Sequence, residues 1–495
     1  RIQARLVGDS LIAEHPGLKI NYNTSKSIAD KDPYMDIANS NSVGVFTTDI
    51  SNSIIKGEND IAVHSWKDLP VEISTDTEVI STLARGDMRD IMIVKKETAL
   101  SKKRNILKVL TSSPRRKHNL NKVLPGLFPV KYSSLIFEEV RGNIETRLNK
   151  FIDGDGDIIL IAKVALDRII EYGDEKISRK VKDILQNTKW IILPLSIFPT
   201  APGQGAIAVE ARKDNLMLKK MFEKINDVDA FSDVISEKRI LSKYGGGCSQ
   251  KIGLSIWSAR GIKLHSLVGE TEEGESLVRM GHFGNENNEA TCKTETRLLY
   301  PNNIDRKMFD RVAIQNKELN NIKNSFVFIS RKSVLDYCEK LDSSNIFWTS
   351  GLKCWNYAVE KGYWVNGSSD NMGERTGIDI ENILSKGLKK YKLSHNSASS
   401  DIFQIMPTYQ LVFNKKKMQD LDLDSKEEFY WMSPLQFDIA LELFPSIKDK
   451  NHSCGFGRTY DHLKRILPKS SKISCYFSYE KWIEFHRIEK SFQNE

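Results

Sequence analysis

Residues 140–170 read VRGNIETRLNKFIDGDGDIILIAKVALDRII, and their pattern indicates the fold class. A polar turn precedes a helical stretch that Gly154 and Asp155 interrupt. The apolar run IILIA then predicts a buried strand, and a second helical stretch follows it directly. A buried strand between two helical stretches is typical of an α/β sheet.

The same alternation occurs upstream. Between residues 44 and 97, polar helical stretches separate four β-rich runs, GVFTTDI, DIAVHSW, EVISTLA and DIMIVKK. Residues 105–113 (NILKVLTSS) predict a strand and a polar turn, and residues 115–124 (RRKHNLNKVL) predict a basic helix. We therefore expect α/β units around a mainly parallel sheet.

The composition and the pattern of predicted elements change twice along the chain. Residues 195–212 are rich in Pro and Gly before a strand, as expected for a crossing between domains. A helix over SEKRILSKY and a hairpin from KIGLSIWSA and GIKLHSLVG then predict a small α+β domain. Beyond residue 325 a further α/β series begins with SFVFISRK, and the polar segment 390–401 (KYKLSHNSASSD) is predicted to be a loop.

Composition is that of a globular protein. Of 495 residues, 40% are hydrophobic and 28% are charged, which excludes a disordered, collagen-like or coiled-coil chain. No apolar run approaches the length of about 18 residues that a membrane span needs, so we expect a cytoplasmic protein with no membrane partner. The formal charge of +8 favours an anionic ligand. The six cysteines are scattered without zinc spacing, so we expect no metal site.

A basic and hydroxylic cluster is the most informative feature. It comprises TSSPRR (111–116), RGNIETR (141–147) and Arg168. Hydroxyl and backbone N–H groups at a helix start bind anions, and nearby arginines can hold carboxylates with two hydrogen bonds. The simpler interpretation of any one of these arginines is a solvated basic surface. Their shared position at strand-to-helix turns favours a ligand site for the group.

Two further motifs could carry chemistry. In HSWKDLP (64–70) the side chains of Ser65, Lys67 and Asp68 follow an apolar strand, and an acid beside a cation can move protons or stabilise a cation. Asp68 could equally cap a turn before Pro70. Cys248 follows three glycines, which could expose its sulfur for covalent attachment, although a lone cysteine is more often a small buried residue.

Six motifs occur in an order that resembles the porphobilinogen deaminase (hydroxymethylbilane synthase) family over roughly residues 1–320. They are DIAVHSWKDLP, RGDMRD, TSSPRR, VRGNIETRL, APGQGAIAVE and SEKRILSKYGGGCSQKIG. The resemblance implies two periplasmic-binding-protein-like α/β domains around a cleft and a third, α+β domain that bears the cofactor. Its implied boundaries are 1–95 plus 195–218 for the first domain, 96–194 for the second and 225–322 for the third.

The resemblance also implies a chemistry. Cys248 would hold a dipyrromethane cofactor through a thioether bond, and Asp68 would assist loss of ammonia from porphobilinogen. Lys67, Ser65, Thr111, Ser113, Arg115, Arg116 and Arg141 would bind the cofactor, and Arg5, Arg147, Arg168 and Gln204 would bind substrate. Small-molecule partners, porphobilinogen and hydroxymethylbilane, and a monomeric protein are therefore expected.

Two other functions stay open. The family's G-G-K-G-L-F loop reads NSVGVF here, with Val43 in place of the lysine. This substitution is the basis for an alternative in which the chain is a catalytically impaired binding protein for polycarboxylates. Nucleic-acid binding through the basic surface is the third hypothesis, and the absence of a basic motif interleaved with aromatic residues argues against it.

The tail, residues 325–495, resembles the uroporphyrinogen-III synthase family through looser motifs. These are WTSGLKCWNYAVEKGYWVNGSSDNMGE (348–374), PTYQL, FYWMSP and GFGRTYDHLK. The resemblance implies a C-terminal α/β region that inverts the last ring of hydroxymethylbilane and closes the macrocycle, so that the chain would be bifunctional. Tyr409, Ser433 and Thr459 would border its cleft, although core packing or capping would explain each of them equally well.

Overall fold

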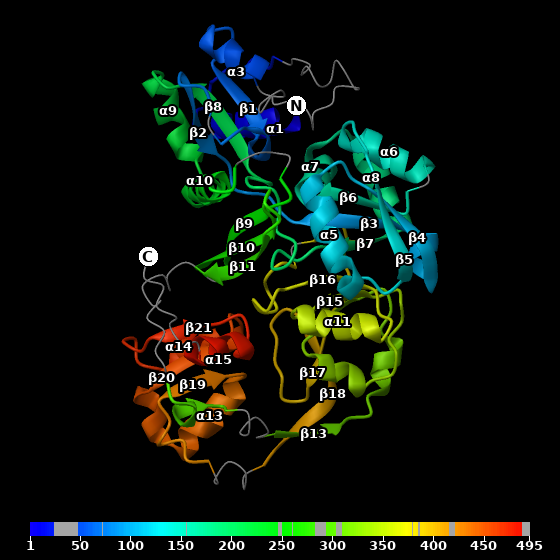
Figure 1. Ribbon diagram of the computed structural model, residues 1–495, viewed down its shortest axis with the longest axis vertical. Coiled ribbons are helices and arrows are strands. Elements are labelled where there is room, and N and C mark those ends of the chain that lie inside the picture. Colours follow the sequence, from blue (N-terminus) through cyan, green and yellow to red (C-terminus); the bar gives the residue numbers. More distant parts are fainter. Residues whose placement is uncertain are drawn as a thin grey trace. The chain divides into compact units, whose positions relative to one another are not determined.

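The computed structural model describes residues 1–23, 48–71, 73–154, 156–245, 250–259, 261–282, 294–302, 309–378, 380–384, 387–414 and 421–487. The chain forms two compact units. The N-terminal unit comprises Arg1–Trp257 and Lys263–Gly281, and the C-terminal unit comprises Ser258–Ile262 and His282–Glu495. Figure 1 labels the elements of both units.

The first sheet of the N-terminal unit has three strands in the order β1-β8-β2. They are β1 (Ile61–Ser65), β8 (Ile207–Arg212) and β2 (Thr77–Thr82). Alternate residues of β8 point to opposite faces. Ile207 and Val209 pack with residues of helix α1 (Ile2–Glu14), whereas Ala208 packs with Val234 of helix α10 (Val228–Ser242). Helices α3 (Thr48–Ile55) and α9 (Leu216–Phe222) complete this part.

The strand directions in this sheet correct one prediction. β8 runs antiparallel to both β1 and β2, so the sheet is not parallel as the sequence predicted. The chain forms the whole second sheet between β2 and β8, so these neighbours are not joined by the short strand–helix–strand unit that the sequence pattern suggested. The run GVFTTDI was also predicted to be a strand, but its residues 48–50 begin α3, and residues 44–47 lie outside the described part.

The second sheet has five strands in the order β5-β4-β6-β3-β7. Strand β4 is parallel to β5 and β6, and β3 is antiparallel to β6 and β7. Every residue of the predicted run IILIA is buried in β6, which confirms that prediction. The strands are β3 (Asp90–Lys95), β4 (Lys103–Leu110), β5 (Lys131–Glu138), β6 (Ile158–Ala162) and β7 (Thr188–Ile192). The helices are α4 (Lys96–Leu100), α5 (Pro114–Leu127), α6 (Ile144–Asp153), α7 (Lys163–Tyr172) and α8 (Glu175–Asn187).

The chain crosses from β7 back to β8 through the predicted Pro- and Gly-rich segment. Gly205 has φ +92°, and a Cβ at this position would lie 2.5 Å from the carbonyl oxygen of Gly86. Glycine is needed here both for the backbone conformation and for the close approach of the two crossings.

The predicted α+β part follows. Strands β9 (Gly253–Ala259), β10 (Ile262–Glu270) and β11 (Ser276–His282) form a sheet in the order β11-β10-β9. Leu241 of α10 packs with Leu254, Leu267 and Leu277 of this sheet, so α10 joins the first sheet to the third.

One buried carboxylate links the second sheet to the crossing. Asp90, at the start of β3, accepts hydrogen bonds from Arg115 (2.7 Å), Arg116 (2.6 Å) and the Gln204 amide (2.9 Å). The guanidinium groups also donate to the carbonyl oxygens of Pro199 and Leu160. Burial raises the pKa of Asp90, but the two guanidinium groups outweigh burial and hold the pKa well below its usual range.

The C-terminal unit contains two sheets. The larger has the order β13-β18-β17-β14-β15-β16 and is parallel except for β13, whereas the smaller, β12-β19-β20-β21, is wholly parallel. The strands are β12 (Leu299–Tyr300), β13 (Phe309–Ala313), β14 (Phe326–Ile329), β15 (Ile346–Thr349), β16 (Val365–Ser368), β17 (Lys390–His395), β18 (Gln404–Phe413), β19 (Glu428–Trp431), β20 (Asn451–Cys454) and β21 (Ile473–Cys475). The helices are α11 (Leu352–Glu360), α13 (Pro434–Leu443), α14 (Arg458–Ile466) and α15 (Tyr479–Arg487).

Two features of this unit differ from the sequence-based expectation. The segment 390–401 was predicted to be a loop, yet its first six residues form β17 between β14 and β18. Leu393 is fully buried, and the charge of Lys392 is satisfied by the buried carboxylate of Glu374. Residues 299–313, which the sequence assigned to the third domain, provide β12 and β13, which pair with strands of the C-terminal unit.

Among the described residues, the structure contains no helix with the length and apolar character required to cross a bilayer.

We predict that Asp90→Ala destabilises the N-terminal unit by about 3–5 kcal/mol, because two buried guanidinium groups lose their counter-charge. Since the folded pKa of Asp90 is depressed, its contribution is complete above the ordinary Asp pKa of about 3.9 and is lost as the pH falls below it. Guanidinium denaturation, followed by hydrogen exchange of peptides from β3 and β6, measures the change in the free energy of unfolding. Asp214→Ala removes an exposed ion pair and is the control; equal stability of the two variants would contradict the prediction.

Candidate active site

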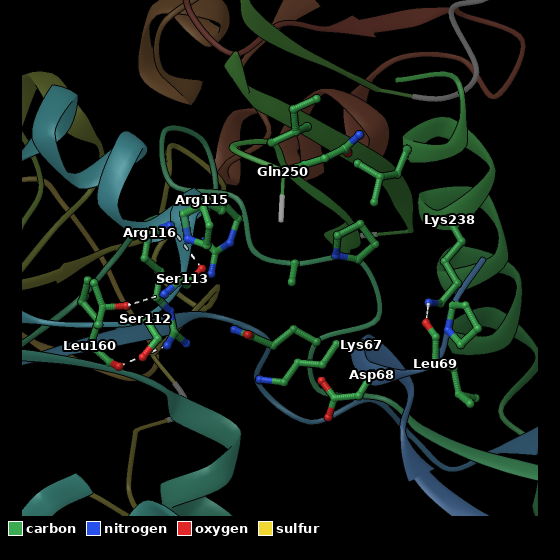
Figure 2. Close-up of a pocket in the computed structure, with 18 of the residues that line it drawn as sticks. Lys67, Asp68, Leu69, Ser112, Ser113, Arg115, Arg116, Leu160, Lys238 and Gln250 are labelled. Atoms are coloured by element: carbon green, nitrogen blue, oxygen red, sulfur yellow. Dashed lines mark hydrogen bonds between the residues drawn. The ribbon is translucent and has the colours of Figure 1, made fainter. Parts of the chain in front are cut away.

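A cavity of about 320 Å³ lies in the N-terminal unit where three segments meet. Its walls come from the turn after β1, the hydroxyl-rich turn before α5 and the C-terminal part of α10. In Figure 2, Lys67 and Asp68 lie on one side of the cavity and Ser113, Arg115 and Arg116 on another. Eight sequence-predicted residues line the cavity: Lys67, Asp68, Thr111, Ser113, Arg115, Arg116, Arg147 and Gln204.

The turn that carries Asp68 is held by buried neighbours. Trp66 and Leu69 are 2% and 3% exposed and pack against Val234 of α10, whereas the Asp68 side chain is exposed. The turn is a short 3-10 helix, η1 (Trp66–Asp68), which follows β1 directly. The alternation of buried and exposed residues thus presents the only carboxylate among the described cavity-lining residues.

Lys67 lies beside this carboxylate. Burial lowers the pKa of Lys67, the Asp68 carboxylate opposes that shift, and the guanidinium of Arg116 adds to it. Arg147, at the first turns of α6, also lines the cavity. Burial lowers the pKa of Arg147, Arg116 lowers it further, and Asp68 opposes these effects. Among its described residues, the cavity therefore brings several cations close to the Asp68 carboxylate.

The hydroxyl-rich turn is ordered by its own hydrogen bonds. Ser113 is the N-cap of α5 and accepts from the backbone N–H of Arg116 at 3.4 Å. Thr111 accepts from the backbone N–H of Ser113 at 3.3 Å. Ser112, which the sequence analysis did not single out, donates to the carbonyl oxygen of Val140 and lines the cavity. These bonds fix Thr111 and Ser113 on the cavity wall.

The geometry assigns Arg115, Arg116 and Gln204 a role that the sequence did not reveal. They line the cavity, but their side chains bind Asp90, and they are only 4%, 7% and 1% exposed. Asp90 belongs to the motif RGDMRD, so its position was visible in the sequence, but its partners were not. With Asp90, these three residues form a buried, hydrogen-bonded wall of net charge +1 rather than a set of exposed cations.

Four predicted residues are not among those that line the cavity. Arg5 is exposed on α1, and Ser65 accepts a hydrogen bond from Gln3 at 2.7 Å. Arg141 pairs with Glu139 at 3.2 Å, and Arg168 donates to the carbonyl oxygen of Gly205 at 2.8 Å. The sequence placed Arg141 and Arg147 at one turn, but only Arg147 lines the cavity.

Two predicted positions lie outside the described residues. These are Cys248 and Val43. On the C-terminal side of Cys248, the first residue that the structure describes is Gln250. It lines the cavity and donates a hydrogen bond to the carbonyl oxygen of Tyr244.

A buried ion pair behind the cavity joins the crossing to α10 and β9. Glu237 of α10 is fully buried and binds both terminal nitrogens of Arg85, at 2.8 and 2.9 Å. The same carboxylate accepts from the backbone N–H groups of Gly203 and Ile256, both at 2.7 Å. The sequence analysis did not predict this ion pair, although Arg85 and Glu237 both lie in quoted motifs.

The C-terminal unit has a polar pocket of its own, with a volume of about 610 Å³. It is lined by Glu374, Arg375, Thr376, Ser399, Ser400, Asp401, Arg458 and Asp461. Arg458 begins α14 and donates to the Ser399 side chain at 2.9 Å. No group of three or more His, Cys, Asp or Glu side chains suited to a metal ion occurs in the described parts of either unit.

The three residues predicted to border a cleft in this unit are either buried or form a helix cap. Tyr409 is 1% exposed and its ring packs against Tyr337, 5.4 Å between centroids. Ser433 caps α13 by accepting from the backbone N–H of Gln436 at 3.3 Å. Thr459 is buried in α14, next to the pocket residue Arg458. None of the three is among the pocket-lining residues.

Comparison with known proteins identifies the N-terminal half. The family model "Porphobilinogen deaminase, dipyromethane cofactor binding domain" matches residues 1–220. A porphobilinogen deaminase of Syntrophomonas wolfei is 33% identical over 263 residues, which cover 53% of this chain and 78% of that protein. A probable porphobilinogen deaminase of Thermoplasma volcanium is 34% identical over 268 residues, 53% of this chain and 79% of that protein. A porphobilinogen deaminase of Caldicellulosiruptor saccharolyticus is 32% identical over 255 residues, 51% of this chain and 79% of that protein. Through its N-terminal half, this chain belongs to the porphobilinogen deaminase family.

Proposed function

We propose that the N-terminal unit is a working porphobilinogen deaminase whose chemistry takes place in the cavity beside Asp68. One observation carries the proposal: among the described lining residues, one carboxylate shares the cavity with several cations and with Gln250, two residues along the chain from Cys248. Porphobilinogen carries two carboxylates and a pyrrole N–H. Cations bind the carboxylates, and the lone acid accepts the N–H.

The residues present suit a dipyrromethane cofactor, which is the group that the matched family domain binds. The described lining residues are rich in cations and hydroxyls and include one carboxylate, which suits a ligand with several carboxylates and two pyrrole N–H groups. Lys67, Thr111, Ser113 and Arg147 would hold it, with Arg115 and Arg116 behind them as a fixed wall. When bound, it supplies the pyrrole carbon to which substrate units are added.

The thiols that the structure describes support Cys248 as the attachment point. Burial raises the pKa of Cys354 to about 12 and of Cys338 to about 11, so both remain protonated and are poor nucleophiles. Cys454 and Cys475 are buried in strands β20 and β21 of the C-terminal unit. Cys248, by contrast, lies two residues from a cavity-lining residue in the sequence.

The cavity residues would have separate roles in binding and in catalysis. Lys67 and Arg147 bind the substrate carboxylates and hold the ring. Asp68 accepts the pyrrole N–H, and its negative charge stabilises the cation that develops on porphobilinogen as the C–N bond breaks and ammonia leaves. After the new C–C bond forms, the displaced ring proton passes to a base. Asp68 is the only carboxylate among the described cavity-lining residues that could accept this proton.

A second activity is proposed for the C-terminal unit: ring inversion and closure of hydroxymethylbilane, as in uroporphyrinogen-III synthases. The motifs of residues 325–495 that resemble that family are the basis of the proposal. The candidate site is the polar pocket of about 610 Å³, in which Arg375 and Arg458 lie beside three carboxylates, Glu374, Asp401 and Asp461. Arg375 pairs with Asp401, and Arg458 lies 4.0 Å from Glu374, so a carboxylate-rich ligand would displace these partners to reach the two guanidinium groups. The product of the first reaction would be the substrate of the second.

We predict that Asp68→Ala lowers porphobilinogen consumption by a factor on the order of 10²–10⁴, the range typical of an acid–base group. The fold should be unchanged, because the Asp68 side chain is exposed. Consumption and ammonia release by the purified full chain measure the effect. Asp76→Ala changes another exposed acid of the same domain and should retain activity. A wild-type chain that binds porphobilinogen without consuming it would support the alternative of an impaired binding protein, and normal turnover by Asp68→Ala would remove Asp68 from its role.

We predict that the full chain converts porphobilinogen mainly to the type III uroporphyrinogen isomer, because the C-terminal unit captures hydroxymethylbilane before it closes unaided. Arg458→Gln should shift the product toward type I, since an arginine of the pocket is lost. Arg297→Gln, which removes an exposed arginine of the same unit, is the matched control. Chromatography of the oxidised isomers gives the ratio, and exclusive type I product from the wild-type chain would contradict the second activity.

A further inference from the structure

The backbone around Asp68 is held by a lysine from another part of the chain. Lys238 of α10 donates from its ammonium group to the carbonyl oxygen of Leu69 at 2.7 Å. The Lys238 side chain is buried, with the residue 7% exposed, and it lines the cavity. Figure 2 shows this bond beside the turn that carries Asp68.

The bond restrains the peptide group that follows Leu69, one residue beyond Asp68. Leu69 donates its own N–H to the carbonyl oxygen of Trp66 at 3.3 Å, which closes the turn on one side. The next residue is Pro70, which has no N–H. The Leu69–Pro70 peptide can therefore accept a hydrogen bond but cannot donate one, and Lys238 supplies the donor.

The exposed Asp68 side chain depends on this restraint. Burial does not fix its carboxylate, since only Trp66 and Leu69 on either side are buried. The direction of the carboxylate is set by the backbone between them. A catalytic group that loses its position by about 1 Å can lose a factor of about 10² in rate.

The helix that carries Lys238 is itself held by further contacts. Its neighbour Glu237 binds Arg85 and the backbone N–H of Ile256 in β9. The helix that carries both residues ends at Ser242, six residues before Cys248 in the sequence. A single helix thus holds the acid-bearing turn and leads directly to the proposed attachment point.

We propose that Lys238 is a positioning residue, which holds the Asp68 turn at a fixed place relative to helix α10. The inference rests on the proposed deaminase function. It assigns the ammonium group to the backbone of the enzyme, not to a carboxylate of the substrate. The two roles make opposite kinetic predictions, because a positioning contact acts on the chemical step and a substrate contact acts on binding.

The test is steady-state kinetics of the full chain with Lys238→Met. We expect kcat to fall about tenfold while KM stays within about a factor of two. Lys238→Arg, which restores a cationic donor, should recover most of the rate. Lys243→Met removes an exposed lysine just beyond the same helix and should match wild type.

A double-mutant comparison separates positioning from a general loss of structure. If Lys238 acts through Asp68, Lys238→Met should change the residual rate of Asp68→Ala by less than about twofold, because coupled residues are not additive. A full tenfold loss in that background, an increase in KM at constant kcat, or an unchanged kcat in Lys238→Met would each overturn the inference. Turnover by the wild-type chain shows separately whether the proposed function itself holds.

Discussion

The arrangement of the cavity depends on one buried carboxylate that binds two adjacent arginines and offsets part of their charge. Arg115 and Arg116 are consecutive and both nearly inaccessible to solvent. Side by side and unpaired, two such charges would be costly to bury. Asp90 takes a hydrogen bond from each and another from Gln204, and this links the start of β3, the start of α5 and the crossing to β8. Lys67 and Arg147 line the same cavity and are not among the residues that bind Asp90.

Part of this site could be predicted from the sequence. Asp68 follows an apolar strand, and the TSSPRR turn precedes a helix, so their place at the ends of strands was readable from local pattern. The partners of the arginines were not readable. Asp90 lies 25 residues from Arg115, and nothing local distinguishes an arginine that faces a ligand from one that faces a buried carboxylate. The same holds for Lys238, whose acceptor is 169 residues away.

The fold, too, could be predicted from the sequence only in part. The buried strand β6 was evident because its five residues are all apolar, whereas β17 was missed because KYKLSH is polar. Its Lys392 is buried only because Glu374 lies opposite, a contact that depends on tertiary structure. The direction of β8 could not be predicted either, because its neighbours β1 and β2 lie far from it in the sequence. In the C-terminal unit the predicted residues Tyr409 and Ser433 pack or cap, and the pocket is lined by charged residues that sequence patterns did not single out.

In the proposed reaction, the cavity works on a pyrrole primer attached to the chain at Cys248, which lies outside the described residues. The intact mass of the purified protein, followed by mapping of the modified peptide, tests this attachment. We expect a mass excess equal to two porphobilinogen units less the ammonia lost from each, located on the peptide that contains Cys248 and absent from Cys248→Ser. An unmodified wild-type mass, or an adduct on a different cysteine, would contradict it.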